Sequence, residues 1–155
     1  MSVQAICHIG ICVKDLEHSR AFYRDVLGFK ELTRLEVDDD TSKKFLEVDD
    51  LKLRCIFLER DGLRIELMSY GDSTTGKGEI SPIYERGLTH FAIRVHDVDE
   101  MVARIEAAGG EILRHTEIRN EAYQSHCIFA KDPDGVRLEL IESPGDPMQP
   151  LGEPL

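Results

Sequence analysis

The sequence predicts an α+β protein made of two βαβββ modules, because segments of its first half recur in its second half. Three such repeats occur in the same order: 8–17 with 90–99, 55–57 with 127–129, and 61–67 with 134–140. In the first repeat, HIGICVKDLE parallels HFAIRVHDVD, and both place a helix-capping aspartate after alternating apolar residues. The organisation expected is a first module over 1–70, a linker over 71–87, a second module over 88–142 and a proline-rich tail over 143–155.

Apolar periodicity predicts the same run of elements in each module. Alternation predicts opening strands at 5–13 and 89–95. Apolar residues at three-to-four spacing predict helices over 16–27 and 98–108, each of which ends at a glycine. Further strands are expected at 30–37, 53–60, 63–69, 111–118, 124–131 and 136–142, with loops at 38–50 and 71–87.

The composition is typical of a folded protein from a reducing compartment. The chain has 155 residues, and no apolar run approaches the roughly 20 residues of a membrane-spanning helix. Its net charge of −11 opposes broad attraction to nucleic acid or to an anionic membrane. The four cysteines form no C-x-x-C motif and lie in apolar runs, which predicts buried thiols and a cytoplasmic protein.

Strand parity places the chemistry on one face of each module, because successive side chains of a strand point to opposite faces of the sheet. One face of the four repeated strands is aliphatic and is expected to lie under the helices. The opposite face carries one imidazole and one carboxylate in each module, among other side chains: His8, Gly10, Cys12, Arg64, Glu66, Met68, His90, Ala92, Arg94, Arg137, Glu139 and Ile141.

Two histidines and two glutamates at equivalent positions of a duplicated module predict a metal site with the ligands His8, Glu66, His90 and Glu139. The alternative is that both glutamates bond nearby arginines and both histidines are ordinary core residues. The joint recurrence of all four residues favours the metal. Neutral imidazole nitrogens and carboxylate oxygens suit Ni²⁺, Zn²⁺, Fe²⁺, Mn²⁺ or Co²⁺.

The chain resembles the vicinal oxygen chelate superfamily, which includes glyoxalase I, bleomycin resistance proteins, methylmalonyl-CoA epimerase and extradiol dioxygenases. The resemblance covers nearly the whole chain and is carried by HIGI at 8–11, RAFYRDVLGF at 20–29, IEL at 65–67, GLTHFA at 87–92 and DPDGVRLEL at 132–140. It implies an open, cup-shaped sheet of eight strands with helices on the outer face and the metal inside.

The resemblance is closest to glyoxalase I and to methylmalonyl-CoA epimerase, and it implies a metal-dependent lyase or isomerase. Bacterial glyoxalase I carries its ligands in the order His, Glu, His, Glu and moves a proton within a glutathione hemithioacetal through a metal-stabilised enediolate. An epimerase-like racemase is an alternative, to which Ser81-Pro82-Ile83 is similar. An extradiol dioxygenase and a non-catalytic small-molecule binding protein are further alternatives, and the complete ligand set counts against both.

For a glyoxalase-like reaction we expect Glu139 to act as the base, with Glu66 as the second candidate. Arginines on the metal-facing side are candidates to bind the carboxylates of glutathione or the phosphates of coenzyme A, and the alternative is that they pair with acidic neighbours. The residues expected to contact a small-molecule substrate are Arg64, Arg94, Arg137, Met68 and His126. A homodimer is expected, with the metal site built within one chain or between two.

Overall fold

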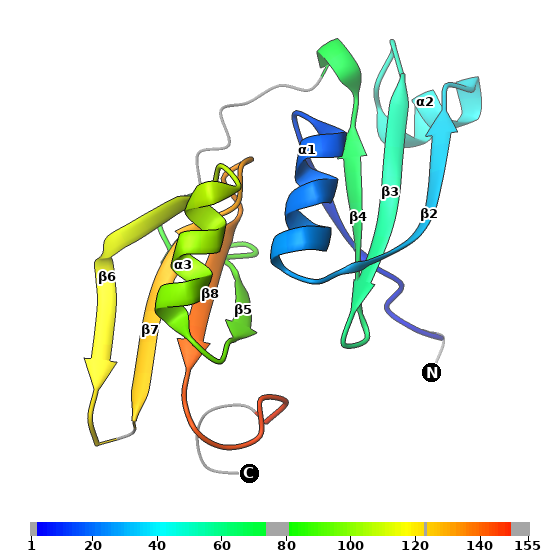
Figure 1. Ribbon diagram of the computed structural model, residues 1–155. Helices are drawn as coiled ribbons and strands as arrows, with labels where there is room; N and C mark the ends of the chain where they lie inside the picture. Colours follow the sequence, from blue (N-terminus) through cyan, green and yellow to red (C-terminus); the bar gives the residue numbers. More distant parts are fainter. Residues whose placement is uncertain (1–2, 74–80, 123, 150–155) are drawn as a thin grey trace. The chain divides into compact units, whose positions relative to one another are not determined.

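The computed structural model describes residues 3–73, 81–122 and 124–149, which form two compact units, Met1–Glu79 and Ile80–Leu155. Each unit contains one four-stranded sheet with one helix packed on a single face (Figure 1). The predicted α+β class with two βαβββ modules is therefore confirmed. Among the described residues, no helix has the length and apolar character needed to cross a membrane.

The first unit follows the predicted order, with one additional helix. Its strands pair in the order β1-β4-β3-β2, and only the β1–β4 pair is parallel. Its elements are β1 (Ile9–Cys12), α1 (Leu16–Ala21), a π-helical turn (Phe22–Val26), β2 (Lys30–Val37), α2 (Asp40–Leu46), β3 (Leu53–Arg60), β4 (Leu63–Ser69) and a 3₁₀ turn (Gly71–Ser73).

The second unit repeats this topology. Its strands pair in the order β5-β8-β7-β6, and again the first pair is the parallel one. Its elements are β5 (Phe91–Arg94), α3 (Val98–Ala107), β6 (Glu111–Asn120), β7 (Ser125–Lys131) and β8 (Arg137–Glu142).

The helices α1 and α3 each begin directly after the aspartate that the sequence predicted as the cap. The Asp15 side chain accepts hydrogen bonds from two backbone N–H groups of α1, and the Asp97 side chain accepts one from the N–H of Glu100 in α3. Such caps satisfy N–H groups that have no partner within the helix. The predicted helix over 16–27 is split, because Phe22–Val26 continues α1 with π-helical bonding.

The aliphatic faces form the two cores, as strand parity predicted. In the first unit, Ile65 and Leu67 of β4 are fully buried on the face of the sheet against which α1 packs. In the second unit, Leu138 and Leu140 of β8 are fully buried against α3. Because both cores occupy the helix-covered faces, the opposite face of each sheet is left for the imidazole and carboxylate side chains.

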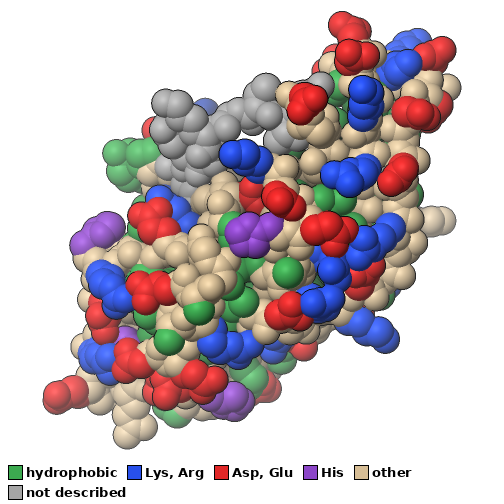
Figure 2. Space-filling view, turned by 45° about the horizontal axis from the view of Figure 1, so that its top comes forward, with side chains coloured by type: hydrophobic (Ala, Val, Ile, Leu, Met, Phe, Trp, Pro, Cys, Tyr) green, Lys and Arg blue, Asp and Glu red, His purple; other side chains and the backbone are tan. Residues whose placement is uncertain are grey.

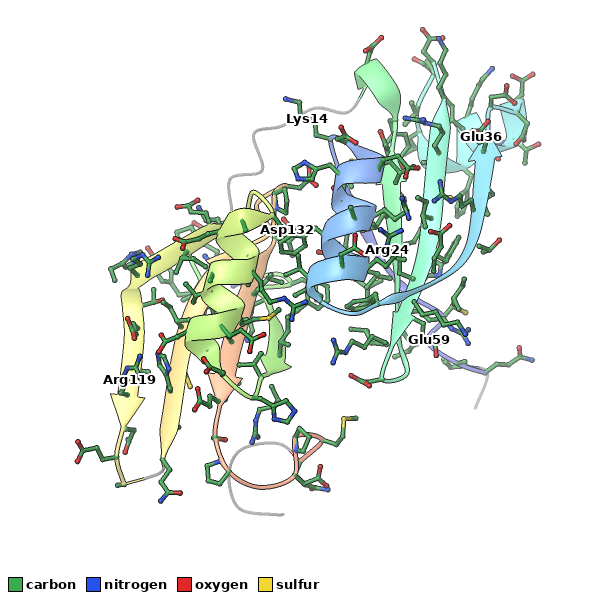
Figure 3. The ribbon with its side chains drawn as sticks, in the orientation of Figure 1. Lys14, Arg24, Glu36, Glu59, Arg119 and Asp132 are labelled. Atoms are coloured by element: carbon green, nitrogen blue, oxygen red, sulfur yellow. The ribbon has the colours of Figure 1, made fainter. Side chains whose placement is uncertain are left out.

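The segment Asp132-Pro133-Asp134-Gly135 forms the turn before β8. The buried Asp132 side chain accepts hydrogen bonds from the N–H groups of Asp134 and Val136, at 2.9 and 2.7 Å (Figure 3). Gly135 adopts a φ of 95°, which favours glycine. The turn holds the start of β8, the strand that carries Glu139, in register with β7.

The segment 38–50, predicted as a loop, contains α2, and that prediction is wrong. The Asp39 side chain accepts a hydrogen bond from the N–H of Ser42, and the helix ends at Glu47 in a left-handed conformation. The helix buries none of its own residues, and the side chain of Phe45 is 83% exposed. Its apolar periodicity is therefore weak, which explains why periodicity did not predict it.

Smaller corrections concern strand lengths, cysteines and the tail. The opening strands are shorter than the predicted 5–13 and 89–95, so each histidine directly precedes its strand. Cys7 and Cys12 are exposed rather than buried, although all four cysteines remain thiols. Of the predicted tail, residues 143–149 form bends and turns, and 150–155 lie outside the described residues. Part of the predicted linker, 74–80, also lies outside them.

Candidate metal centre

Each unit contains one close pair formed by an imidazole and a carboxylate. In the first unit, His8 Nε2 lies 3.2 Å from Glu66 Oε2. In the second, His90 Nε2 lies 3.0 Å from Glu139 Oε2. The strand register explains the likeness of the two pairs, because Gly10 is paired with Glu66 and Ala92 with Glu139 across equivalent parallel strands. A histidine two residues before each small residue therefore reaches the carboxylate on the same face.

The geometry of each pair fits two neighbouring ligands of one metal ion. With bonds of about 2.1 Å to nitrogen and oxygen, ligands at a right angle lie about 3.0 Å apart. Each pair brings together an imidazole Nε2 and a carboxylate oxygen, which is a donor set suited to a borderline divalent metal. The same distance also fits a hydrogen bond, so each pair is satisfied without a metal.

A phenylalanine ring packs edge-on against each histidine. The centroids of the His8 and Phe57 rings are 5.2 Å apart, and those of His90 and Phe129 are 5.6 Å apart. The two phenylalanines occupy equivalent positions, because Phe57 is paired with Glu66 and Phe129 with Glu139 across adjacent strands. The repeated Cys-Ile-Phe triplet thus marks a ring that fixes the orientation of each imidazole. The repeat is visible in the sequence, whereas the contact of its phenylalanine with the histidine is visible only in the structure.

A cysteine accompanies each carboxylate on the same sheet face. Burial raises the pKa of the Cys55 thiol to about 12, and the hydrogen bond and negative charge of Glu66 add to the effect. Burial likewise raises the pKa of Cys127, with a contribution from the charge of Glu139. Both thiols are therefore protonated at neutral pH, which makes them poor nucleophiles and poor metal ligands. A hydrogen bond with the neighbouring carboxylate contributes to the pKa shift of Cys55, whereas for Cys127 the carboxylate contributes through its charge.

An apolar cluster adjoins the His8–Glu66 pair, and it includes Met68. A β-carbon at position 10 would lie 2.7 Å from Met68 Cε, so this side chain lies over Gly10 on the same face as Glu66. The Tyr70 hydroxyl lies 3.8 Å from Met68 Sδ. The cluster, which the segment around α2 helps to build, comprises Leu51, Leu53 and Cys55 with Val37, Leu46, Val48, Phe57, Met68 and Tyr70.

The three arginines predicted on the metal-facing side all have partners within their own units. Arg64 forms an ion pair of 2.8 Å with Glu59. Arg94 donates to the backbone carbonyls of Ser143 and Pro144, at 2.6 and 3.1 Å. The third, Arg137, donates to the carbonyls of Ser81 and Thr89, at 3.0 and 3.4 Å.

His126, predicted near the substrate, lies instead on the opposite face of the second sheet. His126 and Phe129 are three positions apart in β7, so their side chains point to opposite faces of the sheet. Because Phe129 is paired with Glu139, His126, which is paired with Glu142, lies on the face away from Glu139. Its Nε2 lies 2.9 Å from Glu117, within a cluster that also contains Asp99. Arg119 forms ion pairs with both carboxylates (Figure 3), so a guanidinium already supplies the positive charge there.

Charged side chains of both signs are interspersed on the face of the molecule that Figure 2 shows. The first unit contains local ion pairs, such as those of Arg34 with Glu17 and Glu31, at 2.7 and 2.5 Å. These guanidinium contacts lower the pKa of both carboxyl groups, that of Glu17 mainly through Arg20 and that of Glu31 mainly through Arg34. Such exposed pairs contribute little to stability.

Comparison with known proteins places this arrangement in a family. The model of the glyoxalase/bleomycin resistance protein/dioxygenase superfamily matches residues 5–140. The chain belongs to this superfamily. The expected resemblance is thus confirmed over residues 5–140, the range in which all four candidate ligands lie.

Relatives within the superfamily carry the name lactoylglutathione lyase. A probable lactoylglutathione lyase from Vibrio parahaemolyticus is 33% identical over 146 residues, which cover 92% of this chain and 94% of the relative. A putative lactoylglutathione lyase from Brassica oleracea is 31% identical over 147 residues, or 93% of this chain. The chain spans about half the length of that plant relative, at 46%.

Solved structures support the fold and connect it with a metal. A glyoxalase family protein from Bacillus cereus superposes with a TM-score of 0.78 at 19% identity, covering 94% of this chain and 97% of the other. The fosfomycin resistance protein FosX from Listeria monocytogenes, in complex with Mn(II) and sulfate, gives a TM-score of 0.56 at 26% identity. That alignment covers 92% of this chain and 94% of FosX.

Proposed function

We propose that the protein is a divalent-metal-dependent lyase of the glyoxalase I type, in which His8, Glu66, His90 and Glu139 hold the metal. The observation that carries the proposal is the exact recurrence of one Nε2–Oε2 pair, at 3.2 and 3.0 Å, in both units of a superfamily member. When bound, the metal would act as a Lewis acid toward the oxygens of a small carbonyl substrate. The names of the relatives support the lyase reaction.

Glu139 is the better candidate for the base that removes a proton beside the substrate carbonyl and returns it to the neighbouring carbon. Its side chain is 27% exposed, whereas that of Glu66 is 14% exposed and accepts a hydrogen bond from Cys55. A carboxylate with fewer restraints can change position more readily during proton transfer. Glu66 is then the carboxylate that stays in place.

The substrate we propose is the hemithioacetal of glutathione and a small ketoaldehyde. The apolar cluster around Met68 provides a surface for the carbon skeleton beside His8 and Glu66. Anionic groups of glutathione require a guanidinium, and Arg64 is the most accessible of the three arginines, at 54% exposure. Arg94 and Arg137 would have to exchange backbone carbonyls for the ligand.

The test is turnover by protein stripped of metal and reloaded separately with Ni²⁺, Zn²⁺, Fe²⁺, Mn²⁺ or Co²⁺. We expect metal-dependent formation of lactoylglutathione from methylglyoxal and glutathione, which His90→Ala abolishes and the exposed control His115→Ala retains. Parallel assays measure deuterium exchange into methylmalonyl-CoA and catechol-dependent oxygen uptake. Silence in the first assay with turnover in either of the others would replace the proposed reaction, and no metal binding at all would remove the proposed site.

Four ligands require the two pairs to meet, within one chain or between the two chains of a homodimer. Mixing His8→Ala with His90→Ala separates these arrangements. If the site is shared between chains, a mixed dimer regains one site with both histidines, and activity returns on mixing. If each site lies within one chain, every site in the mixture lacks a histidine, and activity stays absent. Size-exclusion chromatography with light scattering gives the oligomeric state.

A further inference from the structure

The two half-sites differ at the second ring nitrogen of the histidine. Thr89 Oγ1 lies 2.8 Å from His90 Nδ1, while His90 Nε2 faces Glu139 at 3.0 Å. Both nitrogens of this imidazole therefore have partners. In the first module the residue equivalent to Thr89 is Cys7, which directly precedes His8 and carries a thiol, a weak hydrogen-bonding group.

We propose that Thr89 is a positioning residue that pairs with His90 Nδ1 both before and after a metal binds at Nε2. The proposal rests on the proposed metal site, and it deepens that site by assigning a support that, among the described residues, the second half has and the first does not. A hydroxyl suits this task because it can either donate or accept a hydrogen bond. A second partner of this kind orients a metal-binding histidine and selects its tautomer.

The hydroxyl has to change its direction of donation when metal binds. In the neutral tautomer with its hydrogen on Nε2, His90 would donate to Glu139, and Thr89 would donate to Nδ1. A metal at Nε2 needs the lone pair there, which moves the hydrogen to Nδ1. Thr89 then accepts from Nδ1, and the imidazole keeps a partner on both sides.

Arg137 holds the backbone of the same threonine. Its guanidinium donates to the carbonyl of Thr89 at 3.4 Å and to that of Ser81 at 3.0 Å. Arg137 lies two residues before Glu139 on the same strand face, so one strand carries the carboxylate and also anchors the residue that orients the imidazole. The equivalent Arg64 pairs with the carboxylate of Glu59 instead. In the second half-site, Glu139 contacts Nε2 of His90 and Thr89 contacts Nδ1, while Arg137 anchors the backbone of Thr89. Among the described residues, the imidazole of the first half-site has only the polar contact with its glutamate.

The experiment measures Zn²⁺ affinity by competition with a chelator, for the full-length wild type, Thr89→Val and Thr89→Ser. We expect Thr89→Val to bind about 10-fold more weakly, since loss of such a partner lowers metal affinity by roughly 10- to 100-fold. Thr89→Ser keeps the hydroxyl and should retain affinity. Cys7→Ala, at the equivalent position of the first module, is the matched control and should leave affinity within about two-fold.

A second measurement reads the tautomer itself, which a merely structural role would not change. Nitrogen-15 spectra of the histidine side chains should show a hydrogen on Nε2 of His90 without metal and on Nδ1 with Zn²⁺. In Zn²⁺-loaded Thr89→Val the Nδ1 hydrogen should exchange faster with water. Wild-type protein that binds Zn²⁺ while Thr89→Val binds equally well would overturn this inference and leave the proposed function intact. Failure of the wild type to bind Zn²⁺ would overturn both.

Discussion

The two half-sites share their ligands and differ in what surrounds them. The His8–Glu66 pair lies beside an apolar cluster, and its carboxylate is bonded by the buried thiol of Cys55. In the His90–Glu139 pair, the neighbouring thiol of Cys127 interacts with the carboxylate through its charge alone, and the histidine is supported by Thr89. Duplication has kept the chemistry of the pair, while each copy has acquired different neighbours. Under the proposed function, the first half would hold the substrate and a fixed carboxylate, and the second would hold an oriented histidine and a movable carboxylate.

The largest expected difference between the halves is in catalysis. Glu139→Gln should lower kcat by about 100- to 10,000-fold, because a general base contributes roughly that much. Glu66→Gln should lower kcat less than Glu139→Gln does, and it should weaken metal binding at least as much as Glu139→Gln does. Steady-state kinetics at saturating metal, with metal content measured on the same samples, separate the two effects. A larger loss of kcat in Glu66→Gln at full metal occupancy would exchange the two roles.

Core truncation tests whether the halves are equally well packed. Leu67 and Leu140 occupy equivalent positions, and both are fully buried. Changing either to alanine should lower the free energy of unfolding by about 2–5 kcal/mol, because a cavity remains. Urea unfolding followed by circular dichroism measures the loss, and Leu63→Ala, with a side chain 37% exposed, is the control. A loss below about 1 kcal/mol for only one leucine would contradict equal packing.

Helix capping should matter by a smaller and similar amount in both halves. Asp15→Ala and Asp97→Ala each remove the side chain that accepts hydrogen bonds at the start of a helix. Each change should lower the free energy of unfolding by about 1 kcal/mol. Asp99→Ala, within the first turn of α3, is the matched control and should have less effect. Thermal unfolding of the three variants would contradict this view if Asp99→Ala lost the most stability.

The smallest effect concerns α2, which only the first half contains. Hydrogen bonds from Ser42 hold the pKa of the Asp39 carboxyl below its usual value. Because the folded pKa lies below the unfolded one, this contribution is full above the unfolded value and is lost as pH falls through the folded one. Amide hydrogen exchange at Ser42 and Lys43, corrected for intrinsic rates, should show less protection at pH 3 than at pH 6. Asp39→Asn should remove most of this pH dependence.

Much of the fold could be predicted because its signals are periodic and local. Alternating strands, capping aspartates and repeated turns each depend on a few neighbouring residues, and the duplication supplied every signal twice. The segment around α2 could not be predicted in this way, because none of the helix's residues is fully buried and Leu46 is its one residue in the apolar cluster. The position of His126 could not be predicted for a different reason, because the face on which its side chain lies depends on the pairing of β7 with β8.

The sequence by itself singled out the four residues of the candidate ligand set, because in the four repeated strands a period of two residues places only those imidazoles and carboxylates on the face opposite the aliphatic one. The tertiary structure decided how close each histidine comes to its glutamate, and which groups lie behind them. Phe57, Cys55 and Thr89 reach the pairs through strand register or through a single side-chain torsion. The contacts of Phe57 and Cys55 arise from the pairing of β3 with β4, which are separate segments, and the contact of Thr89 with its neighbour His90 depends on side-chain conformation, so no local sequence pattern records any of them.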